Sequence, residues 1–138
     1  MIRPSQHGSG TASERRLLQA AVALAACVPV AGGLAGVLFG AGLFNASAPD
    51  LTSLDSHARY LSGLLLGIGL AFWWLVPNID KATLPFRLMT FLVVIGGLAR
   101  LAGVAVSGVP SPPMLFALGM ELGVTPLLCA WQTRLARR

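Results

Sequence analysis

The chain has 138 residues, of which 55% are hydrophobic and 11% are charged, and its formal net charge is +5. Roughly a quarter of the residues in an ordinary soluble domain are charged, so this composition excludes that class. The basic residues flank apolar runs and do not cluster with aromatic residues, which excludes a nucleic-acid-binding protein.

Four apolar segments follow a short polar tail. Residues 1–13 are polar and rich in Ser and Gly, and we expect them to form a disordered cytoplasmic tail. The apolar segments cover about residues 17–44, 54–76, 88–107 and 114–133. Each is long enough to cross a hydrocarbon core of roughly 30 Å as a helix. Because lipid cannot satisfy open backbone groups and the linkers are short, residues 14–138 are predicted to form an all-α, antiparallel four-transmembrane-helix bundle.

The basic residues predict how this bundle is oriented. With four spans, the linkers at residues 45–53 and 108–113 contain no Lys or Arg, and eight basic residues fall on the opposite side: Arg3, Arg15, Arg16, Lys81, Arg87, Arg134, Arg137 and Arg138. Basic residues favour the cytoplasmic side of a membrane. We therefore expect a multi-pass protein of the cell inner membrane with both termini in the cytoplasm.

The first apolar segment has an alternative interpretation as a processed signal. Residues 24–27, LAAC, fit a lipoprotein cleavage box that follows Arg15 and Arg16. The chain stays apolar from Val28 to Phe44, whereas a lipoprotein continues into a polar tether, so we favour an uncleaved span. A twin-arginine signal and an organellar transit peptide fit less well, because the chain has several spans and its short tail contains Glu14.

Small residues recur at four-residue spacing in every span, a pattern that lets membrane helices approach closely. They are Gly32, Gly36 and Gly40, Gly63 and Gly67, Gly96, Gly103 and Ser107, and Gly119 and Gly123. The pattern is equally suited to contacts within the bundle and to contacts with a second copy or another membrane protein. Either use implies a closely packed bundle and no particular chemistry.

Five ionisable residues lie within or beside the spans: Asp55, His57, Arg59, Arg100 and Glu121. Each is costly if it faces lipid, so each should point inward and meet a partner. Arg100 and Glu121 lie about 10 to 11 Å below the outer ends of sequential helices, and Asp55 lies one turn from Arg59 on the same face. We therefore expect Arg100 to pair with Glu121, and these four charged residues to form a buried polar cluster in the outer half.

Two interpretations of this cluster remain. It is a structural ion-pair network in an accessory protein, or a site where Asp55, His57, Arg59, Arg100 and Glu121 bind a small anionic or amphiphilic ligand. His57 lies about 200° around its helix from Asp55, which makes it the weakest candidate. An embedded enzyme is less favoured, because the chain has only two histidines and no metal-binding or nucleophile–base motif. Cys27 and Cys129 lack metal-ligand spacing, and we expect no catalytic residue, metal or cofactor.

Three motifs carry a family resemblance. They are D-S-H-x-R-Y-L-S-G at residues 55–63, G-G-L-A-R at residues 96–100, and P-S-P-P at residues 110–113 followed by Glu121. With these motifs, roughly residues 17–133 resemble domain-of-unknown-function family 4345, a bacterial family of small four-helix membrane proteins. The resemblance implies a four-span integral membrane protein of unknown function, and it implies no activity.

Overall fold

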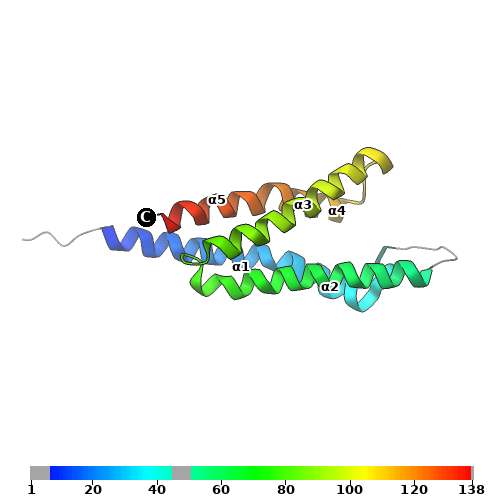
Figure 1. Ribbon diagram of the computed structural model, residues 1–138, viewed down its shortest axis with the longest axis horizontal. Coiled ribbons are helices and arrows are strands. Elements are labelled where there is room, and N and C mark those ends of the chain that lie inside the picture. The colour runs from blue at the N-terminus through cyan, green and yellow to red at the C-terminus, as the bar shows by residue number, and fades with distance from the viewer. Residues whose placement is uncertain (1–6, 45–50, 138) are drawn as a thin grey trace, which may run out of the picture. The chain divides into compact units, whose positions relative to one another are not determined.

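The computed structural model describes residues 7–44 and 51–137, and all the secondary structure in them is helical (Figure 1). The elements in chain order are α1 (His7–Phe39), a 3₁₀ turn η1 (Gly40–Phe44), α2 (Leu51–Leu75), a 3₁₀ turn η2 (Val76–Asn78), α3 (Thr83–Ser107), α4 (Pro112–Gly119), a π-helical segment η3 (Met120–Val124) and α5 (Thr125–Ala136). The elements α4, η3 and α5 follow one another without a break.

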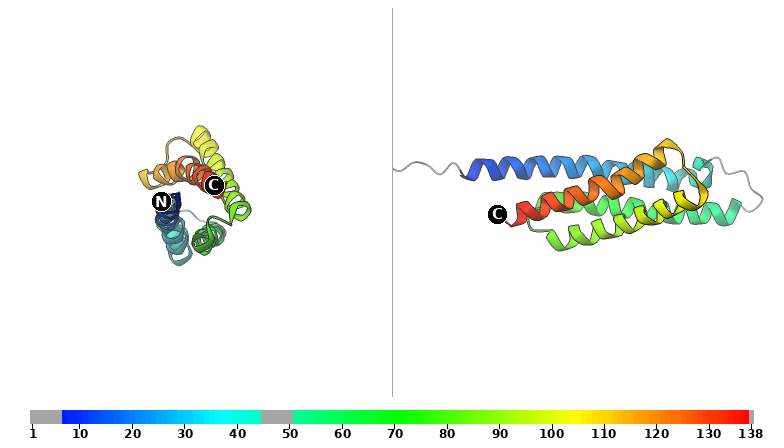
Figure 2. Two further views of the ribbon diagram at one scale, coloured as in Figure 1. Left: turned by 90° about the vertical axis from the view of Figure 1, so that its left-hand side faces the viewer. Right: turned by 90° about the horizontal axis from the view of Figure 1, so that it is seen from above.

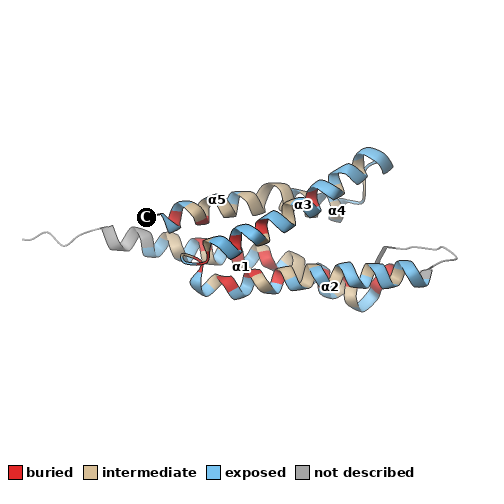
Figure 3. Ribbon diagram, in the orientation of Figure 1, coloured by how far each residue is buried: buried red, intermediate tan, exposed pale blue. Residues whose placement is uncertain are grey.

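Four helices are long and apolar enough to cross a membrane, which confirms the predicted number of spans. They cover Ala12–Gly42, Thr52–Asn78, Thr83–Ser107 and Pro112–Ala136. Most of their residues are exposed or half-buried, as the pale blue and tan positions show along each helix (Figure 3). The third span begins at Thr83 instead of near residue 88, because Pro85 is tolerated in the first turn of a helix.

The N-terminal end of α1 differs from the sequence-based prediction. The helix begins at His7, so residues 7–13, for which a disordered tail is predicted, are helical. Residues 1–6 of that tail lie outside the described residues. Once a long helix has formed, each further residue adds a backbone hydrogen bond without a new nucleation cost, which explains the extension. Pro29 lies inside α1 and does not end it.

The chain divides into two compact units. Unit 1 consists of Met1–Ala25 and Leu75–Arg138, and unit 2 consists of Ala26–Trp74. Within unit 1, α3 and α5 lie side by side (Figure 2), and both contact η3. The core of unit 1 lies around the segment that joins α2 to α3, and its most buried side chains include Leu18, Ile79 and Phe86.

Unit 2 contains the second part of α1 and most of α2. A Cβ atom added to Gly33 would lie 2.5 Å from the backbone nitrogen of Leu66, and one added to Gly69 would lie 2.9 Å from that of Val30. These distances are too short for any side chain, so α1 and α2 approach at glycine positions. The contact therefore follows the small-residue principle, although Gly33 and Gly69 are not in the predicted four-residue pattern.

Candidate functional site

Asp55 and Arg59 form an ion pair on α2, with Arg59 Nε 2.7 Å from Asp55 Oδ2. The pair also binds the end of α1. Asp55 Oδ1 accepts the backbone N–H of Ala41 at 2.9 Å, and Arg59 Nη1 donates to the carbonyl oxygens of Val37 at 2.5 Å and Leu38 at 3.2 Å. The last carbonyls of a helix have no partner within it and attract a cation. Asp55 and Arg59 therefore cap the C-terminal end of α1.

Gly40 makes this cap sterically feasible. Its φ of 55° lies in the left-handed region that favours glycine, and a Cβ atom at this position would collide with the Asp55 carboxylate. The spacing of Asp55 and Arg59 predicts that they share one helical face, but it does not predict their role at the end of α1. A glycine that follows an apolar helix is a recognised C-terminal signal, and Gly40 supplies it.

Arg100 and Glu121 form a second ion pair, between α3 and η3. Arg100 Nε lies 3.1 Å from Glu121 Oε2, and Nη2 lies 3.1 Å from Oε1. This two-pronged contact is the strong geometry for an arginine and a carboxylate. The Arg100 side chain is 30% exposed and that of Glu121 is 15% exposed. The sequence predicts this pair, because Arg100 and Glu121 lie at similar depths along sequential helices.

The remaining nitrogen of the Arg100 guanidinium has a poorer partner. Arg100 Nη1 lies 3.0 Å from the Met114 sulfur. A thioether is a weak hydrogen-bond acceptor, so this nitrogen is less well satisfied than the two that meet Glu121. Arg100 thus keeps hydrogen-bonding capacity that the ion pair does not use.

The π-helical segment η3 presents Glu121 to α3. Pro126 has no N–H to donate within the helix, and the backbone here widens to a π-type turn in which Thr125 N–H bonds the carbonyl of Met120. The Thr125 hydroxyl donates to the same carbonyl at 2.9 Å. A Cβ atom at Gly97 would lie 2.7 Å from Leu122 Cδ2 and 2.9 Å from Glu121 Cβ. The glycine therefore lets α3 approach η3 closely, one turn before Arg100.

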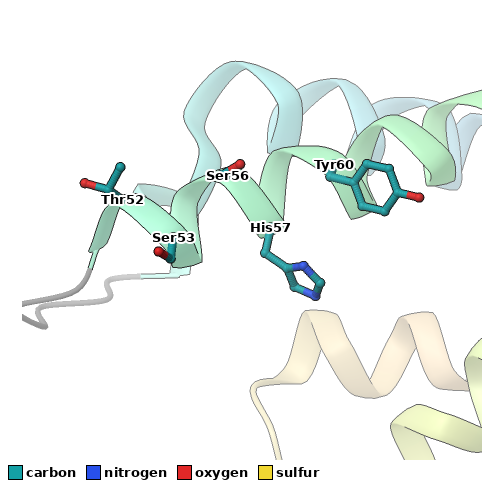
Figure 4. Close-up of a pocket in the computed structure, with 5 residues that line it drawn as sticks. All are labelled: Thr52, Ser53, Ser56, His57 and Tyr60. Carbon is teal, nitrogen blue, oxygen red and sulfur yellow. The ribbon is translucent and has the colours of Figure 1, made fainter.

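Figure 4 shows the His57 side chain on α2, and His57 is two residues from Asp55, therefore about 200° around the helix from it. Its side chain is exposed and shares an open, shallow hollow with four other residues of the same helix: Thr52, Ser53, Ser56 and Tyr60. Asp55 and Arg59 do not line this hollow. His57 is therefore separate from Asp55 and Arg59 on its helix. The helical angle of about 200° predicts this separation.

Unit 1 contains buried and half-buried amide side chains that the sequence pattern does not predict as site residues. Gln132, on α5, is fully buried, and its Nε2 donates to the carbonyl of Ile79 at 2.7 Å and to Thr83 Oγ1 at 3.0 Å. Gln19, on α1, donates through Nε2 to the carbonyl of Val76 at 2.9 Å. Uncharged amides at the ends of apolar spans carry little sequence signal, because nothing in their spacing marks a partner.

Arg15 also holds the segment between α2 and α3, and a separate contact joins α1 to α5. Arg15 Nη2 donates to the carbonyl of Pro77 at 2.8 Å and lies 3.3 Å from Asp80 Oδ1. Trp131 Nε1 donates to Glu14 Oε1 at 3.3 Å. We call this set the loop clamp: Glu14, Arg15, Gln19, Asp80, Trp131 and Gln132. Because a turn has backbone carbonyls without helical partners, Arg15, Gln19 and Gln132 of the loop clamp supply hydrogen bonds that the segment between α2 and α3 would otherwise lack.

A family model described as domain of unknown function (DUF4345) matches residues 17–132. The chain belongs to this DUF4345 family. The matched range contains the Asp55–Arg59 and Arg100–Glu121 pairs, the π-helical segment and most of the loop clamp, so these features lie within the family domain. No curated protein and no solved structure matches the chain.

The predicted site residues of this DUF4345 protein fall into separate places. Asp55, Arg59 and His57 lie in unit 2, whereas Arg100 and Glu121 lie in unit 1. Each arginine is bound to a carboxylate of its own unit, and the joining of all four charged residues in one cluster stays a prediction. In the described part of the chain, no group of three or more His, Cys, Asp or Glu residues could hold a metal ion. The geometry is that of charge pairing between helical segments.

Proposed function

We propose that the protein is a structural or accessory membrane subunit whose ion pairs hold its helices in register. One observation carries this proposal: Arg59 and Arg100 already have partners within their own units. Arg59 is bound by Asp55 and the end of α1, and Arg100 is bound by Glu121. Side chains that are bound in this way stabilise a bundle and present little free charge to a substrate.

The proposed setting is the cell inner membrane, where the helices form an antiparallel bundle with both termini in the cytoplasm. The four apolar helices support the membrane location. The orientation rests on the basic residues, which lie outside the linkers at residues 45–53 and 108–113. The antiparallel arrangement rests on the short linkers between consecutive spans.

In this setting the Arg100–Glu121 pair lies within the membrane. Arg100 is seven residues before Ser107, the end of its span, and Glu121 is nine residues after Pro112, the start of the next. At 1.5 Å per residue these positions are about 10 Å and 13 Å deep. An unpaired charge at such a depth costs several kcal/mol, so pairing is what makes the two residues tolerable there.

A charge exchange tests the structural role. We expect Arg100→Glu alone and Glu121→Arg alone to reduce the folded protein in the membrane by about fivefold or more, because breaking a buried pair costs roughly 3–5 kcal/mol. The double exchange restores opposite charges and should recover part of the loss. The readout is the monodisperse peak of a C-terminal fluorescent fusion after detergent extraction. A double variant no better than the single variants would contradict the proposal.

A second candidate function is the binding or transport of a small anionic or amphiphilic molecule at Arg100. It is favoured by the contact between Arg100 Nη1 and the Met114 sulfur, because an anionic oxygen would be a much better acceptor. Arg100 also remains 30% exposed. In this interpretation Glu121 positions the guanidinium, and the free edge of Arg100 meets the ligand.

The double exchange also separates the two functions. It keeps an ion pair between α3 and η3 but moves the cation from Arg100 to position 121. If the native protein is purified with a bound small anion or lipid and the folded double variant loses it, the binding function is supported. If both proteins carry the same molecules, or neither carries one, the binding function is contradicted and the structural role stands.

Partner chains are part of the proposal. Gly96, Gly103, Gly119 and Gly123 have open space where a Cβ atom would lie. Such positions permit close approach by a helix of a second copy or of another membrane protein. Cysteine cross-linking in native membranes at position 103, with exposed Leu101, about 200° around the same helix, as a comparison position, tests for a partner. Equal cross-linking at both positions would argue against a specific face.

A further inference from the structure

The end of unit 1 that carries the loop clamp has a strong excess of positive charge. Among its described residues, the acidic ones are Glu14 and Asp80, and the basic ones are Arg15, Arg16, Lys81, Arg87, Arg134 and Arg137. The Arg100–Glu121 pair, which lies farther along α3, adds no net charge to unit 1. The net positive charge of the described part of unit 1 is therefore confined to one end of its helices.

The loop clamp explains why basic residues from three distant segments meet there. Arg16 follows Arg15, whose guanidinium lies against Asp80. Lys81 follows Asp80, and Arg134 comes about one turn after Trp131, whose indole donates to Glu14. A contact between Arg87 Nη2 and Thr133 Oγ1 at 3.4 Å also joins α3 to α5. The basic residues are thus brought together by specific contacts and not only by their order along the chain.

Four of these cations are left without compensation. The side chains of Arg16, Lys81, Arg134 and Arg137 are exposed and make no hydrogen bond or ion pair with another described residue. The nearby carboxylates already have partners, since Asp80 meets Arg15 and Glu14 accepts from Trp131. We call these four side chains the basic face. Like charges held close together favour an anion that several of them can share.

We propose that the basic face binds the headgroups of anionic phospholipids. Its residues lie within about one helical turn of the ends of helices that can cross a membrane, and long basic side chains there reach the level of the headgroups. Trp131, on the same end of α5, is the type of residue that settles at this level. Basic clusters beside membrane helices attract anionic lipids with roughly a fivefold gain for each Lys or Arg near the surface. This lipid site is independent of the Arg100–Glu121 pair and goes beyond the proposed structural role.

Fluorescence quenching by brominated lipid tests the proposal on the full-length chain in vesicles. Trp131 is made the single reporter by Trp73→Phe and Trp74→Phe, at positions that are 39% and 78% exposed. Quenching of Trp131 fluorescence reports which lipid lies next to this residue. We expect the relative affinity obtained from this quenching to be at least about fivefold higher for brominated phosphatidylglycerol than for brominated phosphatidylcholine. The preference should fall steeply between 0.05 and 0.5 M NaCl, as expected for exposed charges. Equal quenching by both lipids at low salt would overturn the proposal.

Two matched variants identify the residues responsible. Replacement of Arg16, Lys81, Arg134 and Arg137 by Gln should reduce the phosphatidylglycerol preference to within about twofold of unity, whereas replacement of the three arginines by Lys, with Lys81 kept, should retain it. Helix content measured by circular dichroism shows that each variant is folded. If the phosphatidylglycerol preference survives in the Gln variant, the assignment to these residues is contradicted. If inorganic phosphate abolishes the preference at constant ionic strength, the site binds a free anion and the lipid assignment is contradicted.

Discussion

At the scale of single residues, Arg59 and Arg100 satisfy their guanidinium groups in different ways. Arg59 donates to Asp55 and to two backbone carbonyls at the end of α1, whereas Arg100 donates twice to Glu121 and once to a sulfur. Backbone carbonyls at a helix end are present whatever the nearby side chains are, but they are accessible only if the chain turns sharply away. Gly40 provides that turn with a φ of 55°.

The cap of α1 predicts a specific effect of substituting Gly40. We expect Gly40→Ala to destabilise the protein by roughly 1–2 kcal/mol from left-handed strain, and further because the methyl group collides with Asp55. The matched control is Gly42→Ala, since Gly42 has open space around it and no left-handed φ. Thermal unfolding in detergent compares the two. If both variants unfold at the same temperature, the cap does not limit stability.

At the scale of helical elements, the contacts are made by glycines that the four-residue pattern only partly identifies. Gly36 and Gly40 belong to the pattern and are closely approached by α2 side chains, but Gly67, Gly103, Gly119 and Gly123 face open space. The closest approach in unit 1 involves Gly97 instead of its neighbour Gly96. Adjacent residues on a helix differ by about 100° in direction, so a one-residue error selects another face.

Gly97 and Gly96 therefore form a matched pair for testing the contact between α3 and η3. We expect Gly97→Ala to lower stability by about 1 kcal/mol or more, because the methyl group overpacks against Leu122 and displaces Glu121. Gly96→Ala has space for its methyl group and should be neutral or stabilising by up to about 1 kcal/mol, through its better helix propensity. The measurement is the thermal unfolding temperature of the two variants and the unmodified protein in one detergent. If both substitutions shift this temperature in the same direction, the close contact between Gly97 and η3 is contradicted.

At the scale of the whole molecule, charge and hydropathy are separated along the sequence. The four apolar helices contain few charged residues, and the basic residues near their ends are concentrated in the N-terminal segment, the α2–α3 connection and the C-terminus. A chain with this pattern favours one orientation in a membrane, because moving several arginines across the bilayer is costly. The proposed orientation rests on these charges, and the same charges form the proposed site for anionic lipids.

Topology gives the corresponding prediction. A reporter that is active only in the cytoplasm, fused after Arg138, should be active, and a reporter that needs the periplasm should be inactive at that position. A fusion in the linker at residues 108–113 should give the opposite pattern, because an odd number of spans separates the two sites. A periplasmic signal after Arg138 would overturn the proposed orientation.

Sequence alone determined the number of spans and their helical state, because apolar length and backbone hydrogen bonding in lipid leave no other solution. It also identified Arg100 and Glu121 as partners, since depth along sequential helices can be counted in residues. Tertiary structure alone decided that Asp55 and Arg59 cap α1, that Gly33, Gly69 and Gly97 are also sites of close approach, and that Gln132 holds the segment after α2. Depth follows from position along a helix, whereas these contacts depend on how each helix is rotated about its axis, and that rotation is set only when neighbouring surfaces meet.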